Sequence, residues 1–413
     1  MAQSTVIWQG QAVAIAQVAT AQVTNAGTDD DIFTFTVTDQ GGRTHTATYT
    51  KVSGDAAADV AAGMAAAWNN DQSPVLARVT ASAYTDTVTL TADTAGQPFI
   101  ASSSASGTGA VGAVTDTTDS SGPNDLNINA NYLGNVKPDG NDKWIVPENT
   151  PAILWGLDQS GVALAQADIQ ATSNQIGGTD DAYLKITLAT YSGDFNYKGT
   201  GQAWIDLLAS DGDAFITNTA RPGEGQTYGL KLRGTAITNL HVYRGTVGYG
   251  VDLDDTTSEV DKVWADGGSV SIGENVTDTG GGGKPDIEHS GGTVNASCPV
   301  GVVNRYSGAE EYTQVKNTWD TMTSFTDSGS IVVKGIGTYG TGDTELYSGS
   351  ALDASQDTRA KTITKLIMRR GSEFEDSDGT FAHTNPVEFP DVADSNEVTF
   401  NFGSARKLTV ADL

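Results

Sequence analysis

The chain has 413 residues, with 51 acidic against 23 basic side chains and a formal net charge of −28. So acidic a chain disfavours direct binding to nucleic acid or to an anionic membrane, because both would repel it. A single cysteine, Cys298, excludes an intrachain disulfide framework, and only four histidines argue against a histidine-rich metal centre. We expect no secretory signal, because no basic segment followed by an apolar one opens the chain. The 48 glycines favour a β-rich protein of turns and repeats.

Residues 1–101 have the pattern of a small α+β domain. Two alternating runs, 32–37 and 44–49, are joined by a Gln-Gly-Gly-Arg turn and predict a β-hairpin. Two further strand signals, 77–81 and 87–91, follow a helical segment. The order is therefore ββαββ, and we expect this domain to serve attachment or assembly.

The helix of this domain is predicted to begin after Asp55, which is placed as its N-cap. Val60, Met64 and Trp68 recur every four residues and form one apolar face. We expect this face to anchor the domain core.

Residues 102–125 are mostly Ser, Gly, Thr, Ala and Asp, with almost no large apolar side chain. Such a segment buries too little surface to order itself, so it is predicted to be a linker between independent domains. A glycine-rich loop within one domain is the alternative.

Residues 126–350 are predicted to form a β-solenoid, a parallel β-helix-like stack of coils. A pattern of Gly, then Ser or Thr, then a β-branched residue recurs through the segment, with its glycines at Gly245, Gly268, Gly292 and Gly329. The intervals are 23, 24 and 37 residues, of which the first two suit one coil each and the last would hold an inserted polar loop, 305–317. We expect a right-handed stack with four residues pointing inward: Val247, Val270, Val294 and Ile331. An antiparallel β-sandwich is the alternative.

The last segment, residues 351–413, contains strand signals and an acidic loop. Because its sequence pattern differs from that of the preceding repeats, this segment is predicted to be a β cap that closes the open end of the solenoid.

The acidic loop of this last segment is the candidate metal site. Glu375, Asp376 and Asp378 are closely spaced oxygen donors before a glycine, as Ca²⁺ sites require. The acidic final position of a full calcium loop is missing, so a solvated acidic turn is the favoured interpretation and no other cofactor is expected.

Catalysis would need two carboxylates held at a fixed separation, as in glycoside hydrolases. Asp252, Asp254 and Asp266 are candidates, but nothing in their arrangement singles them out. Cys298 lies in an apolar run and is predicted to be a buried, inert thiol. The tryptophans, Trp264 among them, fit packing better than sugar stacking. We therefore expect no enzymatic activity.

Several N-terminal segments together suggest a known family: Trp8-Gln9-Gly10, 17–20, 33–37, the helix 60–69 and above all 88–99. They resemble a domain of tailed-bacteriophage virion structural proteins, over about a quarter of the chain. The resemblance carries no catalytic residue.

The resemblance implies a non-enzymatic virion protein that decorates the capsid exterior and stabilises the particle, assembled in the host cytoplasm. The implied partners are the major capsid protein or other virion proteins, with a homo-oligomer, a trimer in preference, and no nucleic acid or membrane. The alternatives are a tail-associated or receptor-binding fibre protein that recognises a host glycan, a polysaccharide-cleaving tailspike, and a bacterial surface adhesin.

Overall fold

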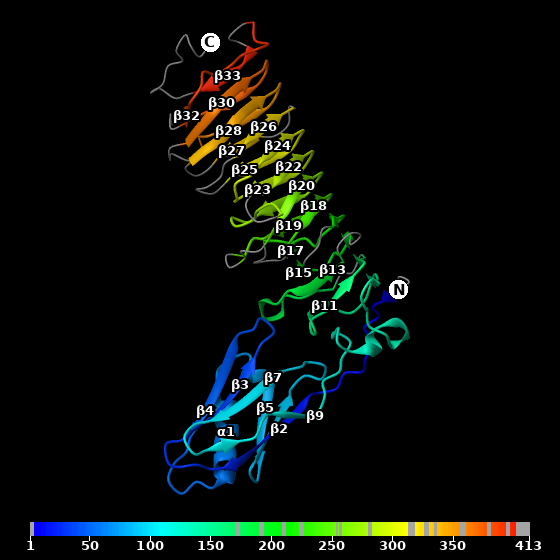
Figure 1. The fold of residues 1–413 in the computed structure, drawn as a ribbon, viewed down its shortest axis with the longest axis vertical. Helices are drawn as coiled ribbons and strands as arrows, with labels where there is room; N and C mark the ends of the chain where they lie inside the picture. The colour runs from blue at the N-terminus through cyan, green and yellow to red at the C-terminus, as the bar shows by residue number, and fades with distance from the viewer. Residues whose placement is uncertain are drawn as a thin grey trace.

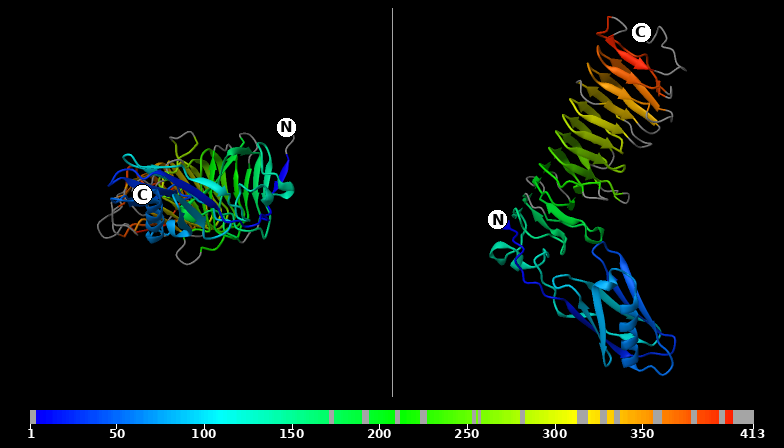
Figure 2. Two further views of the ribbon diagram at one scale, coloured as in Figure 1. Left: turned by 90° about the horizontal axis from the view of Figure 1, so that it is seen from below. Right: turned by 180° about the vertical axis from the view of Figure 1, so that it is seen from behind.

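The computed structural model describes residues 4–401 except 171–173, 190–193, 209–211, 223–226, 253–254, 256–257, 280–282, 313–318, 326–329, 334–336, 356–360, 378–380 and 394–396. The fold is mainly β, with a long stack of coils joined to a small α+β domain (Figures 1 and 2). Within the described part of the chain, no helix has the length and apolar character needed to span a membrane.

The stack is a β-solenoid in which successive strands alternate between two parallel sheets. The first sheet contains, in spatial order, β1 (Thr5–Ile7), β10 (Lys143–Val146), β12 (Gln166–Ile169), β14 (Asp194–Tyr197), β16 (Ala214–Ile216), β18 (Ile237–Val242), β20 (Val260–Ala265), β22 (Asp286–His289), β24 (Val302–Arg305), β26 (Thr321–Ser324), β28 (Gly337–Leu346), β30 (Lys361–Met368) and β32 (Phe381–His383). The second contains β11 (Asp158–Leu164), β13 (Leu184–Leu188), β15 (Ala203–Leu208), β17 (Leu230–Gly234), β19 (Thr246–Tyr249), β21 (Ser269–Ile272), β23 (Thr293–Ala296), β25 (Ala309–Tyr312), β27 (Ser330–Val333), β29 (Ala351–Asp353), β31 (Glu373–Glu375) and β33 (Thr399–Asn401). The predicted solenoid is confirmed, and the antiparallel sandwich is wrong for this region.

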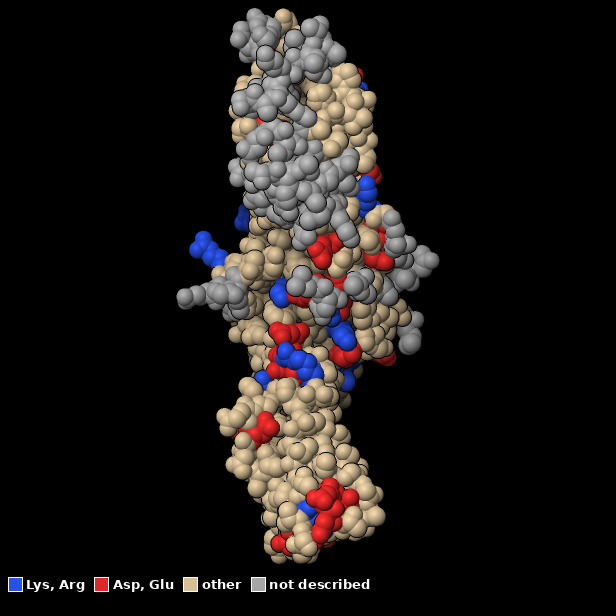
Figure 3. All heavy atoms as spheres, turned by 90° about the vertical axis from the view of Figure 1, so that its left-hand side faces the viewer, with Lys and Arg blue, Asp and Glu red and all other residues tan. Residues whose placement is uncertain are grey.

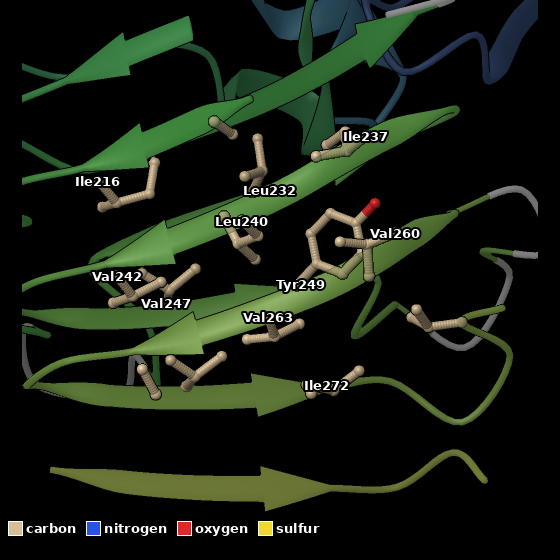
Figure 4. Close-up of a cluster of buried hydrophobic side chains, with 14 of the residues drawn as sticks. Ile216, Leu232, Ile237, Leu240, Val242, Val247, Tyr249, Val260, Val263 and Ile272 are labelled. Atoms are coloured by element: carbon tan, nitrogen blue, oxygen red, sulfur yellow. The ribbon is translucent and has the colours of Figure 1, made fainter. Parts of the chain in front are cut away.

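The solenoid core lies between the two sheets and is built from ladders of apolar side chains (Figure 4). Val270 pairs in register with Val247 on one side and with Val294 on the other, and all three are buried. Ile331 is buried as well. Each coil therefore covers the apolar residues of the next, as predicted. The right-handed sense of the coils stays a prediction.

Glycines form a column at one bend of the solenoid. Gly268 has a φ of +81°, and a Cβ added there would lie 2.5 Å from the carbonyl oxygen of Gly245 in the preceding coil. Both the backbone conformation and the close approach therefore require glycine at this bend. Gly329 lies outside the described residues.

The prediction of an inserted loop at 305–317 is wrong, because the long interval holds one more coil. β24 and β25 occupy it, and the bend between them is made by Gly308 at a φ of +95°. Ala309 and Glu310 follow this glycine in place of Ser or Thr and a β-branched residue, so the sequence pattern did not detect the coil. Residues 313–318 are outside the described part.

The boundary predicted at residue 350 is also wrong for the described residues. Strands β29 to β33 continue both parallel sheets, and Leu352 pairs in register with Phe374. The part of 351–413 that the structure describes therefore adds further coils, with no change of architecture at residue 350. Residues 402–413 lie outside it.

The α+β domain has two antiparallel sheets and one helix. Its strands are β2 (Val18–Asn25), β3 (Ile32–Thr38), β4 (Thr44–Thr50), β5 (Val79–Tyr84), β6 (Thr87–Ala92), β7 (Ile100–Ala105), β8 (Ala110–Val111) and β9 (Thr115–Thr118). The predicted hairpin is β3–β4, and the two further predicted strands pair with each other as β5–β6. Short 3-10 turns are η1 (Leu76–Arg78) in this domain and η2 (Asn129–Asn131), η3 (Leu133–Asn135) and η4 (Thr179–Asp181) in the solenoid.

Helix α1 (Ala57–Asn70) buries Val60, Met64 and Trp68 in the domain core, as predicted. The predicted N-cap is wrong, because the capping residue is Ala56. Its backbone N–H donates a hydrogen bond to the Asp59 carboxylate at 3.0 Å. Asp55 instead accepts a hydrogen bond from the Tyr49 hydroxyl at 2.6 Å.

The predicted linker, 102–125, is wrong because most of it belongs to the sheets of the α+β domain. β7 pairs with β3, and β8 and β9 pair with β2, all antiparallel. The Asp31 carboxylate also accepts hydrogen bonds from the backbone N–H groups of Thr108 and Gly109, both at 3.0 Å. Ladder hydrogen bonds thus order a segment whose side chains bury little surface.

The α+β domain is an insertion within the solenoid, so the boundary predicted for residues 1–101 is wrong at both ends. β1 pairs in parallel with β10, and Val6 and Trp8 lie in the solenoid core. Figure 1 accordingly shows the N-terminus beside the solenoid. The chain therefore leaves the solenoid after Trp8, forms the α+β domain, and returns near Leu126.

Candidate functional site at the junction of the two domains

The predicted calcium site is not assembled from its described members. Glu375 is partly exposed and accepts a hydrogen bond from the Asn401 amide at 3.1 Å, whereas Asp376 is fully buried. Asp378 lies outside the described residues. Nowhere in the part of the chain that the structure describes do three His, Cys, Asp or Glu side chains gather as metal ligands would.

The structure places the two described catalytic candidates, Asp252 and Asp266, apart. Asp252 lies in the loop before β20 and accepts a hydrogen bond from Lys231 at 2.9 Å and another from the Tyr183 hydroxyl. These hydrogen bonds outweigh burial and hold the pKa of Asp252 below its usual value. Asp266 directly follows β20 and accepts from Ser290 at 2.5 Å. Asp254 is outside the described residues.

Cys298 is fully buried in the solenoid core, and burial raises the pKa of its thiol to about 12. It is therefore a packing residue, as predicted, since a thiol in that state is not a nucleophile near neutral pH.

The most distinctive polar contacts lie where the α+β domain meets the solenoid. The chain crosses this junction twice, and Asn131, fully buried, joins the two crossings. Its side-chain oxygen accepts from the N–H of Ala12 at 2.7 Å, and its amide nitrogen donates to the carbonyls of Gly122 and Asp125 at 2.7 and 2.8 Å. We call this set of contacts the Asn131 pin. It fixes both crossings to one point of the solenoid.

A second contact between the two domains is an ion pair. The Arg78 guanidinium donates two parallel hydrogen bonds to the Asp180 carboxylate, at 2.8 and 2.7 Å. Asp180 is largely buried there, with its side chain 6% exposed against 33% for that of Arg78. Such bidentate, charge-assisted pairs are both directional and strong. The carboxylate accordingly raises the pKa of Arg78.

The turn that presents Asp180 has an unusual backbone. Four of its five residues, Gly177, Gly178, Asp180 and Asp181, have positive φ values of 66°, 77°, 55° and 60°. Left-handed conformations are uncommon for residues other than glycine, although Asp and Asn tolerate them better than the rest. On the side of the α+β domain, a Cβ added at Gly41 would lie 2.2 Å from the Asp180 carbonyl oxygen. The turn thus packs tightly against the β3–β4 hairpin.

Between the two domains, next to these contacts, lies a cavity of about 790 Å³, which we call the junction cleft. Its walls carry charges of both signs, including Arg43, Asp158 and Lys185. Arg43 reaches Asp181 across the junction at 3.2 Å, with both side chains mostly exposed. Asp125 also lines the cleft, and burial raises the pKa of its carboxyl group. Clefts between domains are common binding sites, but here the basic groups are already paired with acidic neighbours.

A ladder of alternating charges runs from the cleft along the outer face of the second sheet. Asp158, Lys185, Asp206 and Arg233 occupy adjacent register positions on successive strands. Lys185 lies 3.4 Å from Asp158, and Arg233 lies 3.0 Å from Asp206. Burial raises the pKa of Asp206, although Arg233 opposes the rise. Figure 3 shows acidic and basic side chains intermingled on one side of the solenoid near the α+β domain.

Aromatic side chains form a stack on the outer face of the first sheet. His241 lies between Phe215 and Trp264, with ring centroids 4.8 and 5.7 Å away and the planes within 11° of parallel. Because the rings cover each other's faces, few faces are left on which a sugar could stack. This arrangement supports the packing role predicted for Trp264.

Sequence reasoning missed the junction residues. Arg78 and Asp180 lie 102 residues apart in the chain, and no local pattern connects them. The run Gly177-Gly178-Thr179-Asp180-Asp181 is a readable signal for a left-handed turn, but it does not reveal what the turn contacts.

Comparison with known proteins adds no relative, because no family model, no curated protein and no solved structure matches this chain.

Proposed function

We propose that this protein is a non-enzymatic structural component of a bacteriophage particle. In this proposal the α+β domain attaches to the major capsid protein or another virion protein, and the solenoid projects from the particle. The proposal rests on the insertion of the α+β domain into the solenoid. Two chain crossings and an ion pair fix this compact domain to one end of the long solenoid.

This double connection suits a virion component whose solenoid must keep a constant orientation relative to its attachment domain. A domain joined by one flexible linker would let the solenoid swing freely. Here Asn131 pins both crossings and Arg78 bridges the domains to Asp180. The net charge of −28 also suits a surface that faces solvent rather than packaged nucleic acid.

The proposal of no enzymatic activity is supported by the state of the candidate carboxylates. Asp252 is held by Lys231 and Tyr183, and Asp266 accepts from Ser290. A glycosidase needs a carboxyl pair with separated pKa values that faces a substrate site. Asp206 is buried and has a raised pKa, but its nearest charged partner is the structural ion-pair residue Arg233.

Mass spectrometry of purified phage particles from the natural host tests the proposal. We expect the chain in many copies per particle, and we expect the purified protein to bind saturably to particles that lack it. Absence from the particles would contradict the proposal. Turnover of capsular or cell-wall polysaccharide that Asp252→Asn or Asp206→Asn abolishes would contradict the non-enzymatic role.

A receptor-binding fibre is the second candidate. It is favoured by aromatic side chains at the ends of strands of the first sheet, because Tyr243, Tyr306 and Phe325 are each about 40% exposed. Their rings also stack on neighbours, Tyr243 on His241 and Tyr306 on Phe325, so a glycan would contact mainly their exposed edges. The same side chains would instead be buried between copies of the chain in the trimer that the resemblance implies. Glycan-array binding with an unchanged monomeric mass would favour the fibre, whereas a trimeric mass by sedimentation would favour the assembly role.

A further inference from the structure

We propose that the Arg78–Asp180 pair is a releasable latch that sets the angle between the α+β domain and the solenoid. In this device the Asn131 pin is the fixed point of a hinge, and the pair closes the junction at a second point, where the turn at 177–181 meets the α+β domain. The inference rests on the geometry of the junction and not on the proposed virion role.

The connections between the domains allow a hinge and little else. Both crossings, one after Trp8 and one before Leu126, pass the same buried residue, Asn131. Ile15 and Ser121 then pair as the crossings enter the α+β domain. Two strands tied together at their base can bend as a unit, but they cannot twist or separate freely.

The turn at 177–181 supplies one reason for the latch to open. Asp180 and Asp181 are both held in the left-handed region, at φ values of 55° and 60°. Aspartate tolerates this region better than most residues other than glycine, but two consecutive left-handed aspartates are uncommon. Release of Arg78 removes the contact that holds the Asp180 carboxylate in place, so the turn is free to change conformation.

Electrostatic repulsion supplies the second reason. Asp39, Asp180 and Asp181 all line the junction cleft, and Arg43 and Arg78 are the basic residues that face them from the α+β domain. Without Arg78, Asp180 loses its bidentate partner while the acidic neighbours remain. Asp39 and Asp180 then repel across the cleft. The contacts that remain across the junction include the mostly exposed Arg43–Asp181 pair and a hydrogen bond from the Gln40 amide to the Leu154 carbonyl at 2.7 Å.

The latch is tested by measuring distances between two spin labels in the full chain. The labels are attached at Tyr84→Cys, at the 82% exposed tip of the β5–β6 hairpin, and at Val302→Cys on the solenoid, in a Cys298→Ala background. We expect one narrow distance at low salt for the otherwise unchanged chain. Arg78→Ala should add a second distance, with the closed-to-open ratio lower by about tenfold or more, the range for a charge-assisted pair.

Two further experiments test whether the ion pair determines the distance between the labels. Asp180→Asn keeps a residue that tolerates the left-handed turn but removes the charge, and it should give the same second distance. Salt at about 1 M screens the repulsion among the acidic residues of the cleft, so it should shift Arg78→Ala partly back towards the closed distance. The unchanged chain should keep its narrow distance, because the pair is in direct contact at 2.7 Å and Asp180 is largely buried.

Lys284→Ala is the matched control, because Lys284 pairs with Asp320 at 2.6 Å within the solenoid and is 31% exposed, close to the 33% of Arg78. It should keep the single narrow distance. The latch is refuted if Arg78→Ala and Asp180→Asn retain the narrow distance, or if Lys284→Ala loses it equally. Loss of the α1 helical signal in both junction variants would also refute it, since the pair would then maintain the domain fold and not its orientation.

Discussion

Trp8 packs edge-on against Tyr132, with ring centroids 5.3 Å apart and planes 75° from parallel. The two residues stand on either side of the whole α+β domain in the sequence, yet both are buried in the solenoid core. This contact joins the chain segments on either side of the inserted domain and makes residues 5–8 part of the solenoid.

Because the α+β domain is an insertion, two buried tryptophans are predicted to stabilise different domains. Trp8→Ala should lower the stability of the solenoid by about 3–5 kcal/mol, the usual range for a buried Trp-to-Ala change, and leave the α+β domain folded. Trp68→Ala should do the reverse, since Trp68 lies in the core of the α+β domain. Domain-resolved hydrogen exchange distinguishes the two. If Trp8→Ala destabilised both bodies equally, the assignment of Trp8 to the solenoid would be wrong.

The ladder through the solenoid core predicts that charge is not tolerated at Val270. Val270 is fully buried between Val247 and Val294, so Val270→Asp should destabilise the solenoid by about 4 kcal/mol or more. Ser271→Asp is the matched control, because its side chain lies on the outer face of the same strand and should change stability little. Thermal unfolding followed by circular dichroism compares them, and equal melting temperatures would contradict the ladder.

The glycine column predicts that alanine destabilises the protein to different extents at two glycines of similar φ. Gly268 and Gly134 have φ values of +81° and +78°, but a Cβ would meet a neighbouring coil only at Gly268. Alanine at either position should cost about 1–3 kcal/mol for the left-handed backbone. Gly268→Ala should cost more, because the Gly245 carbonyl must also move. Denaturant unfolding measures both, and an equal loss would show that the close approach is unimportant.

The hydrogen bonds of Asp31 predict a pH-dependent contribution to the α+β domain. The N–H of Thr28, with those of Thr108 and Gly109, holds the pKa of Asp31 below its ordinary value of 3.8 despite burial. A lowered pKa means that the contribution is fully present above pH 3.8 and is lost as the pH falls through the lowered value.

Asp31→Asn should therefore have a lower melting temperature than the unchanged chain at neutral pH. The difference in melting temperature should shrink below about pH 3.8. The exposed neighbour Asp30→Asn, which keeps a residue that tolerates its positive φ, is the control and should match the unchanged chain. A difference that stayed constant down to pH 2.5 would contradict a role for the ionised carboxylate.

The sequence predicted those features that local periodicity encodes. The helix face of Val60, Met64 and Trp68 and the inward row at Val247, Val270 and Val294 follow from spacings within a few residues or one coil. The extra coil at Gly308 was missed because one repeat departed from the pattern.

The insertion and the junction could not be predicted in the same way. β1 is three residues long and pairs with β10 across the entire α+β domain, so its partner has no local signal. Apart from Ile100, which is exposed, β7 is made of small and polar residues, and it is ordered by its pairing with β3 rather than by side-chain burial. The Arg78–Asp180 pair likewise depends on which surfaces the folded domains bring together.

Electron cryo-microscopy of the particle would show both the location of the chain and its orientation. We expect density for the α+β domain against the particle surface, with the two-sheet solenoid extending outward at one fixed angle. A solenoid lying flat against the surface with the α+β domain outermost, or particles with no density for this chain, would contradict this expectation.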